Sequence, residues 1–365
     1  MNAPVRKARV LIVEDSAVMR TLLREIINAA PDLEVVGMAP DPIEARELIR
    51  ALAPDVLTLD VEMPHMNGIE FLRRLMRLHP LPVVMVSAFT QAGSQRALEA
   101  LELGAVDIVA KPAGGSAEGL LRCAEEIREK IRCAAAARPR PRGGPAPAPA
   151  PGEAAGPRAD AARLVAIGAS TGGTDAIREV LTRLPANMPG IVMVQHMPES
   201  FTGSFARRLD GLCRLAVKEA AHGERIQPGT VYLAPGHSHL AVRRSGGEYF
   251  TELSRAEPVN RHRPSVDVLF DSVARAAGPR AVGVILTGMG KDGAAGMLAM
   301  HRAGAWTIAQ DQASCVVYGM PREAVALGAA DETRPLVEIA GRVLARLAGE
   351  AHPAPPRQPA HSVDN

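Results

Sequence analysis

A serine stands at a predicted turn, in a pattern that is typical of an exposed nucleophile. Ser170 is the centre of a G-x-S-x-G pattern within Val165–Gly173. The apolar run Leu164–Ile167 before it predicts a buried strand, and the apolar residues of Ile177–Leu184 after it recur with helical spacing. Such a turn lifts a side chain from the carboxyl edge of a sheet and points backbone N–H groups at a bound group. The pattern alone fits a nucleophile, an anion-binding loop or a structural turn.

A nucleophilic serine needs a base and a group that orients the base, and the sequence offers both at predicted strand ends. His196 follows the apolar run Ile191–Gln195, and Asp292 lies in the loop after Ala281–Leu286. Ligand sites in open α/β sheets gather at the carboxyl ends of the strands, so we expect these side chains to meet Ser170 at one edge. The order Ser, His, Asp differs from the Ser, Asp, His order of α/β-hydrolases, which argues against that fold.

Other histidines and acids compete for these roles. His237 and His239 follow the predicted strand Thr230–Ala234, and we keep them as substrate-side or structural residues. The remaining candidates lie in loop or helix contexts where solvated side chains are the usual outcome, and they are His222, His262, His301, Asp267 and Asp271. We therefore prefer His196 as the base.

An acyl-transfer reaction also needs donors for a developing oxyanion. The turn Gly288-Met289-Gly290 offers flexible N–H groups close to Asp292 in the sequence. The N–H groups of Thr171–Gly173, at the start of the predicted helix, are the alternative. Met289 stands between two glycines, where a packed core methionine is less expected.

Polar residues also stand at the strand ends predicted in the first half of the chain. Glu14 and Asp15 follow the first strand, and Asp60, Ser87 and Lys111 end the third, fourth and fifth. Three carboxylates at one edge repel one another unless a cation lies between them, and oxygen ligands with open water positions suit Mg²⁺. A lysine and a hydroxyl across the site would receive the oxygens of a transferred phosphoryl group. We expect a phosphoryl-accepting site here.

Strand and helix patterns alternate in both halves, which predicts two α/β domains, each with a doubly wound parallel sheet. The strands predicted in the first half are Arg9–Val13, Val35–Ala39, Val56–Leu59, Val83–Val86 and Val106–Val109. The helices predicted between them are Ala17–Ala29, Pro42–Leu52, Gly68–Leu78 and Ser94–Leu103. The strands predicted in the second half are Leu164–Ile167, Ile191–Gln195, Thr230–Ala234, Ala281–Leu286 and Ala305–Ala309.

A segment rich in proline and alanine divides the two halves. Residues 134–160 have little to bury and favour polyproline II, so we expect a flexible linker. This places one domain at residues 1–133 and the other at 161–350. Residues 351–365 repeat the linker composition, and we expect a disordered tail.

Composition narrows the class of protein. The 365 residues are 47% hydrophobic but only 3% aromatic, so aliphatic residues must fill the cores. The net charge of +2 and the lack of a basic face or helix-turn-helix pattern argue against nucleic-acid binding. The four cysteines have no C-x-x-C spacing and predict reduced thiols. No signal peptide or membrane-length apolar run is recognised, so we expect a cytoplasmic protein that is not inserted in a membrane.

The first half resembles the receiver domain of two-component response regulators. The resemblance is carried by Glu14-Asp15, by Ser87, by Lys111-Pro112 and by the segment Asp60–Gly68. It implies that Asp60 accepts phosphate from a histidine kinase. It also implies that Mg²⁺ is held by Glu14, Asp15, Asp60 and the carbonyl of Glu62. Many receivers have an aromatic switch residue three positions before the lysine, whereas this chain has Ile108, so the relay of the signal is left open.

The second half resembles the catalytic domain of chemotaxis protein-glutamate methylesterases. The matching segments are Ile167–Gly173, Gln195–Pro198, Tyr232–His237, Pro264–Asp267 and Thr287–Gly293. The resemblance implies that Ser170, His196 and Asp292 form the catalytic triad and that the backbone of Met289 holds the oxyanion. It further implies hydrolysis of glutamate methyl esters on chemoreceptors with release of methanol, and deamidation of receptor glutamines. The receiver would cover the catalytic edge until Asp60 is phosphorylated.

Two other functions remain as alternatives at this point. In the first, the second half binds a receptor carboxylate without catalysis, and an assay for methanol separates this from an esterase. In the second, the chain is a response regulator that acts on nucleic acid, which the absence of a basic face disfavours.

Overall fold

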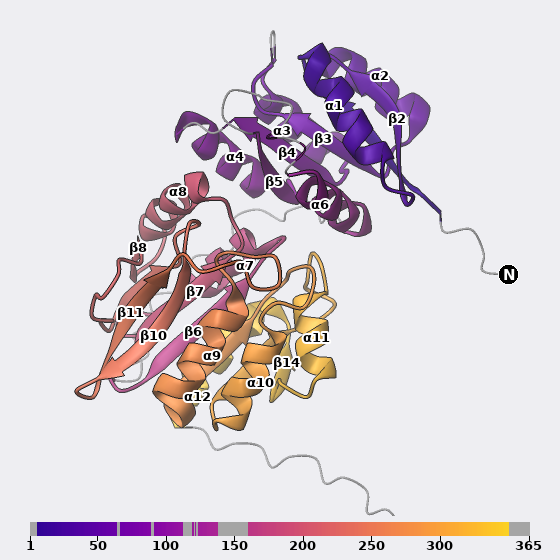
Figure 1. Cartoon of the computed structure of the whole chain (residues 1–365). Helices are drawn as coiled ribbons and strands as arrows, with labels where there is room; N and C mark the ends of the chain where they lie inside the picture. Colours follow the sequence, from indigo (N-terminus) through magenta and orange to yellow (C-terminus); the bar gives the residue numbers. More distant parts are fainter. Residues whose placement is uncertain are drawn as a thin grey trace, which may run out of the picture.

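The computed structural model describes residues 6–63, 66–88, 91–111, 119, 121, 123–137 and 160–349. These residues form two α/β domains, coloured from indigo to magenta and from magenta to yellow in Figure 1. Both sheets that carry the candidate sites are parallel, which confirms the predicted fold class. None of the helices described is both long and apolar enough to span a membrane.

The first domain has a five-stranded sheet in the order β2-β1-β3-β4-β5. The strands are β1 (Ala8–Val13), β2 (Leu33–Ala39), β3 (Val56–Asp60), β4 (Val83–Ala88) and β5 (Asp107–Lys111). The helices are α1 (Ala17–Asn28), α2 (Pro42–Leu52), α3 (Gly68–Leu78), α4 (Gln91–Leu103) and α6 (Ala124–Ala136). Alternate residues of β1 face opposite sides, so Val10 and Ile12 pack with α1 and α6, whereas Leu11 and Val13 pack with α2, α3 and α4. The sheet is therefore covered on both faces.

Helix α6 was not predicted, and it corrects the start of the predicted linker. It continues through Ala136, because Ile127, Ile131 and Ala134 are buried against the sheet and α1. Residues 134–137 therefore belong to the first domain. The rest of the predicted linker, residues 138–159, and the tail 351–365 lie outside the described residues.

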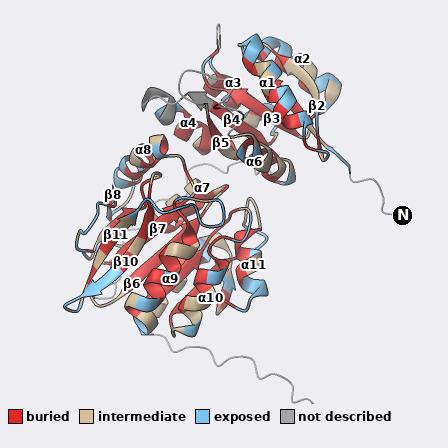
Figure 2. Cartoon of the chain, in the orientation of Figure 1, coloured by how far each residue is buried: buried red, intermediate tan, exposed pale blue. Residues whose placement is uncertain are grey.

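The second domain has a seven-stranded sheet in the order β14-β13-β12-β6-β7-β9-β8. The strands are β6 (Leu164–Ala169), β7 (Gly190–Gln195), β8 (Ala216–Glu219), β9 (Thr230–Leu233), β12 (Ala281–Ile285), β13 (Trp306–Gln310) and β14 (Glu332–Arg334). The helices are α7 (Gly173–Leu181), α8 (Glu199–Asp210), α9 (Val266–Ala277), α10 (Ala294–Arg302), α11 (Met320–Ala326) and α12 (Leu336–Leu347), with a 3₁₀ turn at Gly278–Arg280. One face packs against α7, α8 and α12, and the other against α9, α10 and α11. Figure 2 shows the central strands β6 and β7 buried and the outer helix faces exposed.

The second domain also contains strands that the periodicity did not reveal. A hairpin of β10 (His239–Ser245) and β11 (Glu248–Ser254) is antiparallel and lies apart from the main sheet. Its strands mix apolar and charged residues, and β8 and β14 are short, so none forms a continuous apolar run. The Gly246-Gly247 pair between the hairpin strands is the signal that could have found it.

Candidate active site

The turn after β6 is held by its own backbone. The Ser170 N–H donates to the carbonyl of Thr287 at 3.0 Å. The Ser170 carbonyl accepts from the Gly173 N–H at 2.7 Å and from Nε2 of Gln195 at 2.8 Å. Gly172 has a φ of +75°, which residues with a side chain rarely adopt. The serine is thus fixed where β6 ends and α7 begins.

His196 lies beside Ser170 because of the strand register. Ala169 of β6 pairs with Gln195 of β7, so the next two residues leave neighbouring strands at the same level. The His196 N–H also donates to the Ala169 carbonyl at 3.1 Å. Nε2 of His196 lies 2.8 Å from Oδ2 of Asp292, whereas its Nδ1 is buried and has no hydrogen-bond partner among the described residues. Nδ1 is therefore the nitrogen left to accept a proton.

Asp292 is 1% exposed and is surrounded by donors. Its Oδ1 accepts from Oγ of Ser265 at 2.7 Å and from Nδ2 of Asn260 at 2.8 Å, and its Oδ2 accepts from the Val266 N–H at 2.7 Å. Burial works to raise the pKa of Asp292, but the hydrogen bond and charge of His196 outweigh it and hold the pKa well below its usual range. The carboxylate is ionised at neutral pH and can orient an imidazole.

The turn after β12 presents the predicted oxyanion donor. The Gly288 carbonyl accepts from the N–H groups of Gly319 at 3.0 Å and Met320 at 2.8 Å, which fixes the turn. Gly290 has a φ of +79°. Among the described residues, none accepts a hydrogen bond from the Met289 N–H. This N–H is available to an oxygen of a ligand.

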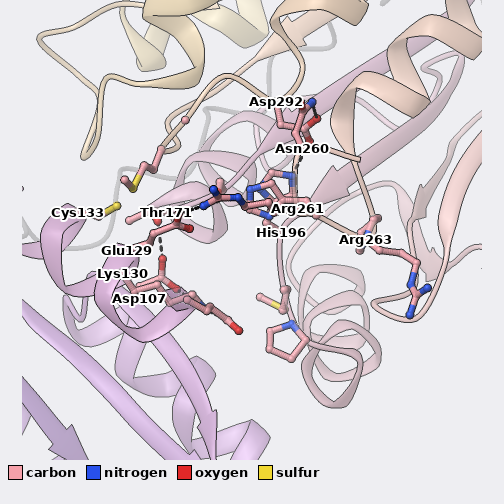
Figure 3. Close-up of a pocket in the computed structure, with 18 of the residues that line it drawn as sticks. Asp107, Glu129, Lys130, Cys133, Thr171, His196, Asn260, Arg261, Arg263 and Asp292 are labelled. Atoms are coloured by element: carbon pink, nitrogen blue, oxygen red, sulfur yellow. Dashed lines mark hydrogen bonds and ion pairs between the residues drawn. The ribbon is translucent and has the colours of Figure 1, made fainter. Parts of the chain in front are cut away.

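These groups line a cavity of about 820 Å³ between the two domains, shown in Figure 3. On the side of the second domain it is lined by Ser170, Thr171, His196, Asn260, Met289 and Asp292. On the side of the first domain it is lined by Asp107, Glu125, Glu126, Glu129, Lys130 and Cys133. The first domain therefore closes one side of the cavity that contains the candidate nucleophile.

Direct bonds hold the two domains together at this cavity. Oγ1 of Thr171, the residue after the candidate nucleophile, donates to Oδ2 of Asp107 at 2.5 Å (Figure 3). Lys130 lies 3.3 Å from the other carboxylate oxygen of Asp107. Arg261 forms an ion pair with Glu129 at 3.0 Å. Burial opposes the charge of Lys130, but Asp107 and Glu126 raise its pKa above the usual range, so this lysine stays charged.

The other candidate histidines pair with groups outside the proposed triad. His239 is 2% exposed, and its ring accepts from the Ser265 N–H at 3.1 Å and contacts the Glu257 carbonyl at 3.0 Å, which makes it a structural residue. His237 contacts its neighbour Ser238 at 2.6 Å. His222 is exposed and accepts from the Leu253 N–H, and His301 pairs with Asp331.

Two of the side chains that we expected to be solvated pack against other residues instead. The ring of His262 is stacked on that of His196, with centroids 3.8 Å apart and an interplanar angle of 12°. Asp267 accepts from Nδ2 of Asn260 at 2.7 Å and from the Gly296 N–H at 2.6 Å, and burial raises its pKa. Asp271 does lie on an exposed face, paired with Arg275. The prediction was wrong for His262 and Asp267 because a loop and a helix N-terminus fold back over Asp292.

The acidic residues of the first domain also converge. Glu14, Asp15 and Asp60 bring carboxylate oxygens within 4.8 Å of one another. Nζ of Lys111 lies 2.8 Å from Glu14 and 2.7 Å from Asp60. Burial raises the pKa of Glu14 to about 7, and the charge of Asp60 adds to this effect. Burial likewise raises the pKa of Asp60 against the opposing charge of Lys111. One lysine does not balance this cluster, so it can hold a metal ion.

The remaining predicted receiver residues lie around this cluster. The Glu62 N–H donates to Oδ1 of Asp60 at 3.3 Å. Ser87 belongs to β4, next to β5, but its side chain is outside the described residues, as is Pro112. Ile108 is 4% exposed in the core. Its carbonyl accepts a hydrogen bond from Lys130.

Comparisons with known proteins assign the family. Residues 165–343 match the model of the CheB methylesterase family, and residues 10–120 match the response regulator receiver domain. A protein-glutamate methylesterase/protein-glutamine glutaminase of Nitrosomonas europaea is 60% identical over 353 residues, which cover 94% of this chain and 98% of that protein. The chain belongs to this family.

One further relative matches most of the chain, and one solved structure matches half of it. The protein-glutamate methylesterase/protein-glutamine glutaminase 3 of Burkholderia lata is 59% identical, covering 94% of this chain and 97% of that protein. The crystal structure of the Thermotoga maritima CheB methylesterase catalytic domain is 42% identical, covering 50% of this chain and 97% of that one, with a TM-score of 0.49.

Some residues of the methylesterase-domain site were missed by sequence reasoning. Asn260 and Ser265 each donate to Asp292, and His262 lies against His196. The signal available for Ser265 was its position before an apolar helix, where it caps α9 by accepting from the Val268 N–H. Asn260 adopts a positive φ of 51°, which asparagine tolerates better than most residues, but no sequence pattern marked it.

Proposed function

We propose that the chain hydrolyses glutamate methyl esters on chemoreceptors, releases methanol and deamidates receptor glutamines, and that phosphorylation of Asp60 regulates these reactions. The observation that carries the proposal is the hydrogen bond between His196 and the buried Asp292. His196 follows β7 at the same level of the sheet at which Ser170 follows β6. The family of the chain supports the choice of substrate. A non-catalytic module would not need an ionised carboxylate behind a histidine.

The arrangement supports a serine-esterase reaction. Oγ of Ser170 attacks the ester carbonyl carbon, and Nδ1 of His196 takes the hydroxyl proton while Asp292 stabilises the imidazolium. The oxyanion accepts from the Met289 N–H, a contribution of about 3 kcal/mol in comparable sites. The imidazolium then protonates the methoxy oxygen, and methanol leaves. Water, deprotonated by His196, attacks the acyl-enzyme and releases the glutamate and Ser170.

The same steps accommodate a glutamine side chain. The carbonyl is attacked in the same way, and the leaving group is ammonia instead of methanol. No additional residue is required, because the proton that His196 returns serves either leaving atom. The expected product on the receptor is glutamate in both reactions.

The receiver site supports regulation by a phosphodonor. Glu14, Asp15, Asp60 and the carbonyl of Glu62 would hold Mg²⁺, and their crowded carboxylate oxygens fit a hard divalent cation. When bound, the ion offsets the negative charge around a phosphoryl group. Asp60 would accept this group from a histidine kinase, with Lys111 and Ser87 as contacts for its oxygens. We also propose that the protein is cytoplasmic, as the sequence predicts.

Strand β5 joins the two sites. Lys111 at its end contacts Asp60, and Asp107 at its start accepts from Thr171, beside Ser170. Phosphorylation draws Lys111 to the new phosphoryl oxygens, and we expect the shift of β5 to weaken the contact at Asp107 and favour an open form. This route does not use an aromatic switch residue, which fits the buried Ile108.

The test is replacement of the nucleophile. Ser170→Ala in the full chain should reduce methanol release from a methylated receptor by about 10⁵-fold or to the detection limit. Methanol release is measured with and without a small-molecule phosphodonor. The control is Ser254→Ala, a serine on an exposed hairpin strand end. Full activity of the Ser170→Ala protein would overturn the proposal.

A further inference from the structure

His262 contacts the candidate base through its ring face alone. The two imidazoles are 3.8 Å apart and nearly parallel, at 12°. The backbone N–H and carbonyl of His262 pair with those of Val259 at 2.9 and 3.1 Å, so the backbone of the residue is held in a tight turn. This turn, residues 259–262, is called the 260 turn below.

The 260 turn holds His196 indirectly as well as directly. Asn260 in this turn donates from Nδ2 to Asp292 at 2.8 Å and to Asp267 at 2.7 Å. Asn260 and Arg261 have positive φ values of 51° and 68°, so the backbone is committed to this conformation. His196 is therefore bonded at its edge by Asp292 and covered on its face by His262, and Asn260 links these two supports.

Burial, more than the charges around it, keeps the ring of His262 neutral. Burial lowers its pKa to about 4, and His196 and Lys130 act in the same direction, while Asp292 and Glu126 oppose them. A neutral aromatic face can lie against an imidazolium, whereas a second imidazolium would repel it. The stack can thus persist when His196 takes a proton.

We propose that His262 is a positioning residue that acts through His196, because its stacked ring keeps Nε2 on Asp292 and leaves Nδ1 for the Ser170 hydroxyl. This inference rests on the proposed function and deepens it. When the imidazole of His196 is held in place, it needs little reorientation at each proton transfer. This matters because the bound geometry of the reacting groups must already be close to the reactive geometry. His262 itself neither donates to nor accepts from the triad side chains.

The experiment compares His262→Phe with His262→Leu in the full chain, in the presence of a phosphodonor. Phenylalanine keeps a flat ring but no nitrogen, whereas leucine keeps apolar volume without a flat face. We expect kcat for methanol release to fall about 10-fold in His262→Leu with KM within twofold of wild type, and to fall less than threefold in His262→Phe. His222→Ala, the loss of an exposed histidine, is the control. Thermal unfolding of each variant checks that it folds.

A second readout separates this inference from the choice of substrate. A fluorophosphonate reacts with an activated serine, as its P–F bond breaks, a P–O bond forms and the base takes the proton. We expect the labelling rate of Ser170 to follow the same order, wild type and His262→Phe before His262→Leu. If wild type is labelled but releases no methanol, the proposed substrate is wrong, and the labelling rates still decide the role of His262.

Three results would overturn the inference. Equal rates for His262→Leu and wild type would show that the stacking of the His262 ring on His196 does not contribute to catalysis. Equal loss in both folded variants would assign the effect to the imidazole nitrogens and not to the ring face. A raised KM with unchanged kcat would make His262 a substrate contact.

Discussion

The two domains each place buried carboxylates at the carboxyl edge of a parallel sheet, but they surround them differently. In the receiver domain, Lys111 forms ion pairs with the buried Glu14 and Asp60, and the exposed Asp15 lies beside them. In the methylesterase domain, Asp292 stands among donors from a histidine, an asparagine, a serine and a backbone N–H. Carboxylates are in excess in the first site, and donors are in excess in the second.

The pKa shifts follow this contrast. Burial raises the pKa values of Glu14 and Asp60, since one lysine does not offset three acids. Burial also opposes the ionisation of Asp292, but its donors hold the pKa well below the usual range. The receiver site is built to gain positive charge or to change charge state. The methylesterase site already has its working charges, and regulation there must act through access and geometry.

Among changes to the charged groups of the two sites, the largest effect should come from removing the negative charge of Asp292. Asp292→Asn keeps the shape but cannot stabilise the imidazolium, so we expect kcat for methanol release to fall by about 10⁴-fold. The measurement is the rate of methanol release at saturating methylated receptor. Asp271→Asn, on an exposed face of α9, is the matched control. If kcat of a folded Asp292→Asn protein decreases less than tenfold, the negative charge of Asp292 is not needed for catalysis. The contrast in charge between the two sites would then have no functional meaning.

An intermediate effect is expected from replacing Asp60, the receiver-domain residue that we propose is phosphorylated. Asp60→Asn removes the acceptor carboxylate, so the ratio of methanol release with phosphodonor to that without it should drop to about one. The measurement is that ratio, at matched protein concentration. Asp55→Asn, at the opposite end of the same strand region, should keep the wild-type ratio. Stimulation that survives in Asp60→Asn would mean that another residue receives the phosphoryl group.

The smallest effect is the response to a divalent cation. Mg²⁺ at tenfold its dissociation constant should stabilise the receiver domain by about 1.4 kcal/mol, a shift of a few degrees in its unfolding midpoint. Differential scanning calorimetry with Mg²⁺ or with a chelator measures the shift. Asp15→Asn should reduce it, whereas Glu25→Gln on the exposed face of α1 should not. An equal shift in Asp15→Asn would place the ion elsewhere.

Strand positions, and the residues that directly follow them, were accessible to sequence reasoning. The apolar runs before Glu14, Ser170 and His196 became strands within one or two residues of their predicted limits. Parallel strands deliver their carboxyl ends to one edge, so a polar residue after such a run has a known location. This logic needs no knowledge of loops.

Residues held by loops were not accessible in the same way. His262 belongs to a turn with two left-handed residues, and its position depends on the bond from Asn260 to an aspartate 32 residues away in the chain. Helix α6 was hidden because its alanine-rich end continues into a segment with linker composition. Such features arise from tertiary contacts, which local periodicity does not encode.

The shortness of strand β5 has a consequence for the proposed regulation. Its five residues, Asp107–Lys111, span about 13 Å between the α-carbons at their ends, and β4 supports them by hydrogen bonds along their length. Under the regulation that we propose, a displacement of Lys111 would be transmitted to Asp107 along the covalent backbone of the strand. No helix has to unwind and no linker has to transmit force. The distance between the two ends of the strand is roughly the width of one helix. The two sheets hold the strand in place between the two sites.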